Sequence, residues 1–233
     1  MPTFSHLHVH TQYSLLDGAA SIEGLYEKAI ADNMPAIAIT DHGNMFGAFK
    51  FVSQAWKKTK VIGKDADGKD ILAPIVKPIV GCEFYVVKDR HIKNFTKELK
   101  DNRYHQVLLA KNAIGYQNLI KLTSLGYIEG MYSKYPRIDK SLIEKYHEGL
   151  IATTCCIGAH VPQAILKSDE AAAEKEFKWW LDIFGEDYYI EIQRHQIPEQ
   201  QIINDRLLQF AKKYKVPVIA TNDSHYINED DAN

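Results

Sequence analysis

The sequence predicts a barrel-like α/β fold built around a mostly parallel sheet. Seven short apolar runs of strand length are separated, in most cases, by longer stretches with apolar residues at helical spacing. Such alternation of strands and helices along a whole chain is typical of parallel sheets, because each crossover helix packs back on the sheet. Neither GxGxxG nor GxxxxGK[ST] occurs in the chain, which favours a barrel over a dinucleotide-binding sheet.

The expected strands start near the N-terminus and recur to the end of the chain. They are HLHVHT (6–11), PAIAITD (35–41), PIVGCEFYVV (78–87), HQVLLAK (105–111), GLIATTCC (149–156), YYIEIQ (188–193) and VPVIATND (216–223). Helices are expected at 22–33, 115–127, 141–149, 169–185 and 198–215. Ser21 is the expected N-cap of the first helix, and Pro198 suits the first turn of the last. We expect one domain over 1–233, with an exposed insertion at about 61–74 around the polar KDADGKD.

Composition excludes several classes of protein. The chain is 45% hydrophobic and 25% charged, which is normal for a globular protein. Its apolar runs are too short to cross a bilayer, and MPTFSHLHVH lacks the features of a secretory signal. Three cysteines, two of them adjacent, do not form a disulfide framework, so we expect a reducing, intracellular location. With a net charge of −2, the chain would contact any nucleic acid only locally.

Residue types that bind transition metals stand at or near the ends of several expected strands. They are His8, His10, Asp41, His42, Glu83, Cys156, Asp223 and His225. Because the carboxyl ends of the strands of a parallel barrel build its active site, residues from the whole chain would converge there. Histidine, aspartate, glutamate and cysteine are the ligand set of zinc-like metals. The pattern therefore indicates a metal centre.

Alternation along strands leaves three questions open. His6, His8 and His10 would share one strand face, so spacing alone does not say which of them bind metal. His105 begins its run, which would place it at the wrong end of a strictly parallel barrel. Cys155 and Cys156 would point to opposite faces of a strand, so only one could face the site. The isolated histidines are expected to be surface or hydrogen-bonded residues; they are His91, His147, His160 and His195.

Seven motifs in sequence order carry a resemblance to a known family. They are HLHVHTQYSLLDG, MPAIAITDHGNMFGAFKF, KPIVGCEFYV, YHQVLLAKNAIGYQNL, YPRIDKSLIEKYHEGLIA, YIEIQRHQIPEQ and VIATNDSHY. The chain resembles the polymerase and histidinol phosphatase (PHP) domain family, in the branch at the N-terminus of bacterial replicative DNA polymerase III alpha subunits. The resemblance implies a distorted seven-stranded (β/α)7 TIM-like barrel. It also implies that the chain is the N-terminal piece of a longer polymerase, without polymerase activity of its own.

The resemblance implies up to three divalent metal ions, with zinc favoured and manganese or iron compatible. The implied ligands are His8, His10, Glu83 and Asp223 for one ion, Glu83, His105 and Cys156 for a second, and Asp17, His42 and His225 for a third. Glu83, Asp223 and His10 would be the catalytic residues among them. His6 lies outside the implied set, so His6→Ala should retain metal where His8→Ala should not.

The implied activity is that of a metal-dependent phosphodiesterase acting as a 3′–5′ exonuclease. It would hydrolyse the 3′-terminal phosphodiester of single-stranded or frayed DNA through metal-activated water, with Lys134 and Arg137 as candidate phosphate contacts. One alternative is a non-catalytic, metal-stabilised scaffold of the polymerase that docks a separate proofreading subunit. A less favoured alternative is a small-molecule phosphomonoesterase of the histidinol phosphatase type. The expected location is the bacterial cytoplasm, without contact to a membrane.

Overall fold

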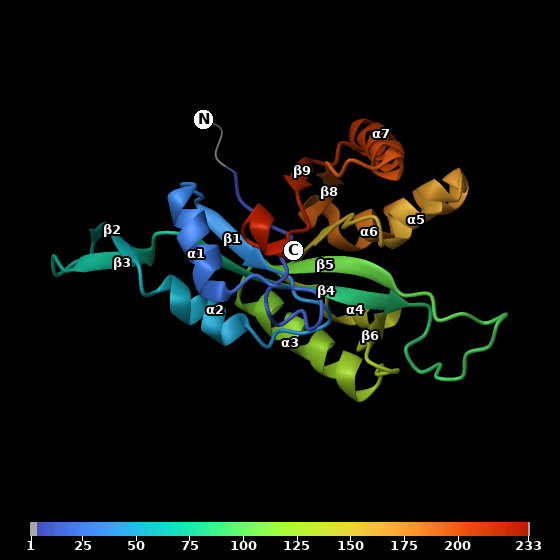
Figure 1. Ribbon diagram of the computed structural model, residues 1–233, viewed down its shortest axis with the longest axis horizontal. Coiled ribbons are helices and arrows are strands. Elements are labelled where there is room, and N and C mark those ends of the chain that lie inside the picture. The colour runs from blue at the N-terminus through green and yellow to red at the C-terminus, as the bar shows by residue number, and fades with distance from the viewer. Residues whose placement is uncertain (1–3, 233) are drawn as a thin grey trace.

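A computed structural model of the protein describes residues 4–232. A seven-stranded sheet curls around the centre of the molecule, with helices packed along its outer side (Figure 1). The strand order is β1-β4-β5-β7-β8-β9, and β6 pairs with β4. The strands are β1 Ala36–Ile39, β4 Lys77–Val87, β5 Tyr104–Ala110, β6 Arg137–Asp139, β7 Leu150–Thr153, β8 Tyr188–Gln193 and β9 Val218–Thr221. The predicted α/β, barrel-like class is confirmed.

Strand β5 runs against its neighbours, whereas the other pairings in this sheet are parallel. Its first residues therefore lie at the same end of the sheet as the last residues of β4. Tyr85, near the end of β4, pairs directly with His105 at the start of β5. An irregular sheet thus accounts for the position of His105, which a strictly parallel barrel would have placed at the opposite end.

The expected strand at 6–11 is an extended segment that forms only isolated bridges. Its backbone accepts hydrogen bonds from β1, where Ala38 N–H donates to the His6 carbonyl at 2.9 Å. On its other side, His10 N–H donates to the carbonyl of Ser224, just after β9, at 2.8 Å. The segment therefore spans the gap between the first and last strands of the sheet and places two alternate histidines, His8 and His10, at one end of it.

Seven helices flank the sheet in the part of the chain that the structure describes. They are α1 Ile22–Ala31, α2 Ala48–Ala55, α3 Ala113–Ile128, α4 Lys140–Tyr146, α5 His160–Leu166, α6 Glu170–Phe184 and α7 Pro198–Tyr214. As expected, Ser21 caps α1 by accepting from Gly24 N–H, and Pro198 is the first residue of α7. Helices α2 and α5 escaped prediction because both start without a side-chain cap, the usual sequence signal of a helix start.

The hydrophobic core lies between the sheet and its helices. Fully buried aromatic residues come from both, including Phe51 of α2, Phe84 of β4 and Phe177 of α6. Each such side chain contributes roughly 1.5–3 kcal/mol by leaving water. Outside this core, β2 Thr59–Lys64 and β3 Asp70–Pro74 form a mostly exposed antiparallel hairpin. Among residues 4–232, no helix combines the length and the apolar character that crossing a bilayer would require.

Candidate metal centre

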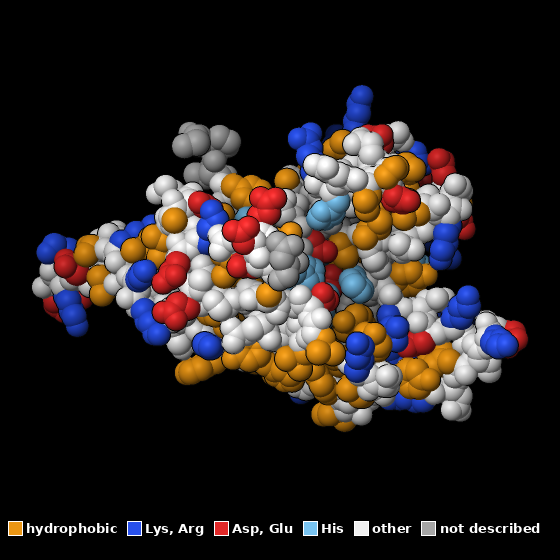
Figure 2. Space-filling model, in the orientation of Figure 1, with side chains coloured by type: hydrophobic (Ala, Val, Ile, Leu, Met, Phe, Trp, Pro, Cys, Tyr) orange, Lys and Arg blue, Asp and Glu red, His pale blue; other side chains and the backbone are white. Residues whose placement is uncertain are grey.

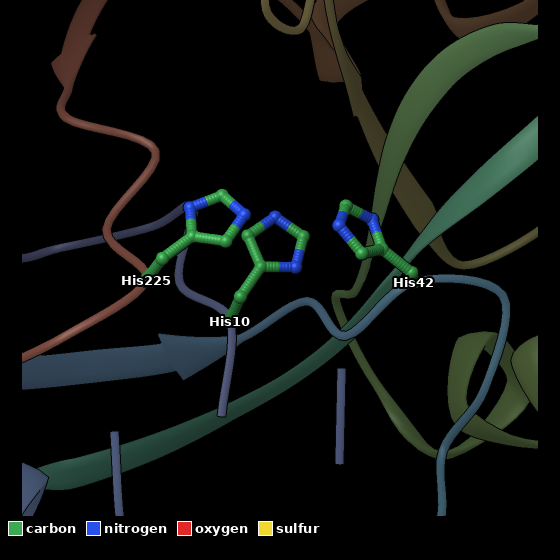
Figure 3. A group of neighbouring side chains, drawn as sticks. All are labelled: His10, His42 and His225. Carbon is green, nitrogen blue, oxygen red and sulfur yellow. The ribbon is translucent and has the colours of Figure 1, made fainter. Parts of the chain in front are cut away.

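The nine predicted ligand residues come together at one end of the curled sheet. They are His8, His10 and Asp17 from the N-terminal segment and its loop, His42 after β1, Glu83 in β4, His105 in β5, Cys156 after β7, and Asp223 and His225 after β9. Figure 3 shows the rings of His10, His42 and His225 side by side. The ring centroid of His10 lies 4.0 Å from that of His42 and 4.2 Å from that of His225.

Glu83 lies at the centre of this cluster and is fully buried. Its Oε1 is 3.2 Å from His8 Nε2 and 3.1 Å from His105 Nδ1, and its Oε2 is 2.5 Å from His42 Nδ1. Burial alone would raise the pKa of Glu83, but the surrounding histidines hold this pKa well below its ordinary value. Glu83 is therefore an ionised carboxylate whose two oxygens face different parts of the cluster, as a carboxylate that bridges two cations must.

Asp223 supplies the second carboxylate of the cluster. Its Oδ1 lies 3.2 Å from His8 Nε2 and 3.1 Å from His10 Nε2. Despite burial, which acts the other way, His8 and His10 lower the pKa of Asp223 to about 2. Asp17 completes the set from a more exposed position, with Oδ2 2.8 Å from His42 Nε2 and 3.7 Å from His225 Nε2.

The donor atoms fit divalent metal ions. In each of four groups, the ligand atoms lie within 4.8 Å of one another; the groups are His10–His42–His225, His8–His10–Asp223, His8–Glu83–Cys155 and Glu83–His105–Cys156. Two buried atoms in them, His10 Nε2 and Asp223 Oδ1, lie 3.1 Å apart, yet neither forms a hydrogen bond of good geometry among the described residues. Buried polar atoms are almost always paired in native proteins. A cation between these two atoms would satisfy both.

The two adjacent cysteines both face the cluster, contrary to the expectation from strand alternation. Strand β7 ends at Thr153, and Cys155 adopts a left-handed backbone conformation with φ of 58°. As a result, the sulfurs of Cys155 and Cys156 lie 3.7 Å and 3.6 Å from Glu83 Oε1. The S–H of Cys155 lowers the pKa of Cys156, while burial raises the pKa of Cys155 well above its ordinary value. Cys156 is therefore the favoured thiolate, although either sulfur can reach a cation.

Glu191 in β8 supports the cluster and was missed by the sequence prediction. Its Oε1 lies 2.8 Å from His8 Nδ1, and its Oε2 accepts from Thr153 Oγ1 at 2.6 Å. This contact turns the other ring nitrogen of His8 toward Glu83 and Asp223. Carboxylates that orient a metal-binding histidine in this way commonly tune the affinity of the site. The available signal was a charged residue between Ile190 and Ile192 in an otherwise apolar strand, where the structure buries it.

Asp41 has a comparable supporting role on the other side of the cluster. Its Oδ1 accepts from Thr11 N–H at 2.6 Å and from Ser14 Oγ at 2.8 Å. Ser14 Oγ in turn lies 3.0 Å from His10 Nδ1. Asp41, one of the strand-end residues considered for metal binding, therefore holds the loop after His10 in place, and its carboxylate is occupied by that task.

The two candidate phosphate contacts differ in position. Arg137 is fully buried, and its guanidinium donates to Asp101 Oδ1 at 2.8 Å and to the carbonyls of Gly130 and Ile92 at 2.9 and 2.8 Å. Arg137 is therefore not placed to bind a phosphate, which corrects that expectation. Lys134 is exposed and lies over the ring of Tyr135, 5.5 Å from its centroid.

Protons are expected to compete with metal ions at this cluster. Burial lowers the pKa of His105, but Glu83 and Cys156 more than offset this effect and raise that pKa to about 11. The pKa of His42 is also raised, mainly by its hydrogen bond to Glu83 acting against burial. Because imidazole binds metal only when neutral, metal binding must release protons. Zinc affinity, measured by chelator competition, is expected to rise steadily between about pH 6 and 8; a flat profile would contradict this coupling.

The chain is similar to known proteins over nearly its whole length. A family model described as the PHP domain matches residues 6–195. DNA polymerase III subunit alpha of Borreliella burgdorferi is 47% identical over 229 residues, which cover 98% of this chain and 18% of the relative. The same subunit of Thermus aquaticus is 44% identical over 232 residues, with coverages of 98% and 18%. The chain thus spans less than a fifth of the length of these relatives.

Solved structures with a similar fold include two proteins of low sequence identity. One, from Bifidobacterium adolescentis, has been assigned as a metal-dependent phosphoesterase; it has a TM-score of 0.57 and 13% identity, covering 97% of this chain and 88% of the other. The second, PsfC from Pseudomonas syringae, has a TM-score of 0.51 and 13% identity, with coverages of 95% and 75%. At this level of identity the similarity concerns the fold alone.

Proposed function

Because the chain belongs to the PHP domain family and its high-coverage relatives are DNA polymerase III alpha subunits, we propose that it is a metal-dependent phosphodiesterase. Its proposed reaction is 3′–5′ exonuclease cleavage at the 3′ end of single-stranded or frayed DNA. The proposed partners are the remaining domains of a polymerase chain, in the bacterial cytoplasm, and a separate proofreading subunit.

The observation that carries this proposal is the convergence of nine ligand residues around the buried carboxylate of Glu83. The proposed ligands are His8, His10, Glu83 and Asp223 for one ion, Glu83, His105 and Cys156 for a second, and Asp17, His42 and His225 for a third. Nitrogen and sulfur ligands favour zinc, and the three carboxylates are compatible with manganese or iron. When bound, such ions lower the pKa of water toward neutrality and stabilise the charge of a reacting phosphate.

In the proposed hydrolysis, the oxygen of water adds to the phosphorus of the 3′-terminal nucleotide. The bond from this phosphorus to the 3′-oxygen of the preceding nucleotide breaks, and that oxygen takes up a proton. The products are a deoxynucleoside 5′-monophosphate and a strand shortened by one residue. Glu83 and Asp223 hold negative charge at fixed positions, His10 lies between Asp223 and His42, and Lys134 is the candidate contact for the strand.

One observation favours a scaffold as the second candidate function. Large apolar side chains are exposed on or next to α2 and α3, including Phe46, Phe49 and Ile128, which is 78% exposed. Figure 2 shows apolar side chains along the lower edge of the molecule, over these two helices. Exposed apolar surface of this kind is common where another protein docks. On this alternative, the metal ions would only stabilise the domain.

The experiment that tests the proposed function measures metal content and nucleotide release together. Zinc- or manganese-loaded chain is expected to release nucleotides from a 3′-mismatched primer, and His10→Ala and Asp223→Asn are expected to lower the rate by at least about 100-fold. His147→Ala serves as the control, because His147 contacts the Glu144 carbonyl far from the cluster. If the wild-type chain binds its full complement of metal and still releases no more nucleotide than these two variants, the exonuclease proposal fails. The scaffold is then the remaining candidate function.

A further inference from the structure

A pocket of about 480 Å³ adjoins the candidate metal centre. Asp223 and His225 of the centre belong to its lining, so the pocket and the cluster share residues. Arg194 and His195, just after β8, line it as well. Figure 2 shows histidine and acidic side chains gathered in a hollow near the middle of one face. What this pocket binds bears directly on the substrate, so the inference below rests on the proposed function.

One cation in the lining of the pocket is available to an anion. Among residues 4–232, Arg194 forms no ion pair and its side chain is exposed. Of the other charged residues in the lining, Lys28 Nζ lies 2.9 Å from Asp32 Oδ2 at the end of α1, and the Asp223 carboxylate contacts His8 and His10. Arg194 therefore remains as an unneutralised cation beside the cluster. A guanidinium of this kind presents paired N–H donors that match the oxygens of a phosphate.

Part of the wall of the pocket is apolar and aromatic. Leu25 and Ile37 are buried beneath it, and Met34 and Ile227 line it beside them. Tyr226 follows His225 directly and leaves 46% of its surface exposed. Nucleobases stack on exposed aromatic rings of this type irrespective of their sequence. Ligand pockets span roughly 300–1,000 Å³, so the observed volume accommodates about one nucleotide.

A chain of hydrogen bonds ties the pocket to the cluster. His195 Nε2 lies 3.2 Å from Gln193 Oε1, and Gln193 Nε2 donates to Glu191 Oε1 at 3.1 Å. Glu191 contacts His8 Nδ1, as described above. Gln193 and Glu191 are both buried. The segment that carries Arg194 is therefore held in a fixed position relative to His8, a proposed metal ligand. A pocket that positions a phosphate at the cluster requires such a fixed position.

We propose that this pocket holds the 3′-terminal nucleotide of the DNA strand. The base and sugar of that nucleotide lie against Tyr226 and the apolar wall, and its 5′-phosphate lies at the cluster beside Asp223 and His225. Cleavage between this phosphate and the preceding 3′-oxygen leaves a deoxynucleoside 5′-monophosphate in the pocket. Because the pocket accommodates one nucleotide, the chain removes one nucleotide at a time from an end.

The test compares the binding of thymidine 5′-monophosphate with that of inorganic phosphate to the manganese-loaded full chain, by calorimetry. Thymidine monophosphate is expected to bind at least about 10-fold more tightly than phosphate. Tyr226→Ala is expected to remove this difference while metal content and phosphate affinity stay unchanged. Arg194→Ala is expected to weaken thymidine monophosphate binding about 10-fold. Tyr116→Ala, which removes a similarly exposed tyrosine from α3, is the control.

The outcomes separate this inference from the proposed function. Equal affinities for the nucleotide and for phosphate, or unchanged nucleotide binding in both Tyr226→Ala and Arg194→Ala, overturn the pocket assignment even if the chain hydrolyses primers. Pocket-dependent nucleotide binding without any primer hydrolysis supports the pocket and overturns the exonuclease. Loss of phosphate binding together with nucleotide binding in Tyr226→Ala also counts against the assignment, since the variant would then act through the cluster.

Discussion

Replacing Glu83 with glutamine is expected to have the largest effect on the metal centre. The carboxylate oxygens of Glu83 lie 2.5–3.2 Å from ring nitrogens of His8, His42 and His105. One substitution therefore removes the negative charge that all three histidines face. Substitutions that only orient a metal ligand already cost about 10–100-fold in affinity or activity. We therefore expect Glu83→Gln to lose at least one bound ion per chain and to lower hydrolysis by more than about 100-fold.

The same variant tests how the cluster behaves without metal. Loss of one partner from a buried charge pair typically costs about 3–5 kcal/mol, so the metal-free Glu83→Gln chain should unfold at lower urea concentration than the metal-free wild type. Glu148→Gln, a change at an exposed site, is the matched control. Metal content by elemental analysis and urea unfolding followed by circular dichroism are the measurements. Full metal content in Glu83→Gln would show that Glu83 is not a shared ligand.

Replacing Arg137 with alanine is expected to have the largest effect on stability. Its guanidinium holds the long connection between β4 and β5, because it donates to the carbonyls of Arg90 and Ile92 and to Asp101 at the other end. Removing it leaves the carbonyls of Arg90, Ile92 and Gly130 without this donor and leaves the Asp101 carboxylate with Arg103 as its remaining ion-pair partner. We expect the free energy of unfolding to fall by about 3–5 kcal/mol. Arg137→Lys should recover little of this, because an ammonium cannot reproduce the guanidinium fork.

Metal content distinguishes a loss of stability in Arg137→Ala from a loss of metal binding. It is expected to stay at the wild-type level in Arg137→Ala, measured at low temperature where the chain remains folded. Lys134→Ala, a nearby change at an exposed side chain, should alter stability by no more than about 0.5 kcal/mol. A stable Arg137→Ala chain with weakened DNA binding would restore Arg137 as a phosphate contact.

Much of the fold was predictable because its signals are local. The helices with a capping side chain or an N-terminal proline, α1 and α7, start where the sequence indicates. The direction of β5 was not predictable, since an antiparallel strand between parallel neighbours depends on how the whole sheet pairs. The position of His105 follows from that direction alone. The segment 6–11 has the alternation of a strand, but it lacks a continuous neighbour to form a regular ladder.

The candidate site shows the same division between local and global information. Residue types and their places at strand ends were sufficient to nominate His8, His10 and Asp223, whose side chains the structure brings together. The orientation of Cys155 was not accessible, because strand alternation ceases where the backbone turns left-handed. Arg137 was wrongly nominated as a phosphate contact, because no sequence signal reveals that its guanidinium donates to carbonyls of a distant loop.

The pairing of the N-terminal segment with residues after β9 has a consequence for the order in which the protein is made. The ribosome makes His8 and His10 more than 200 residues before Ser224, so the backbone hydrogen bond between His10 and Ser224 can form only after the strands between them have been made. Contacts so distant in sequence are slow to form. The candidate metal centre can therefore be completed only after every strand of the barrel has been synthesised.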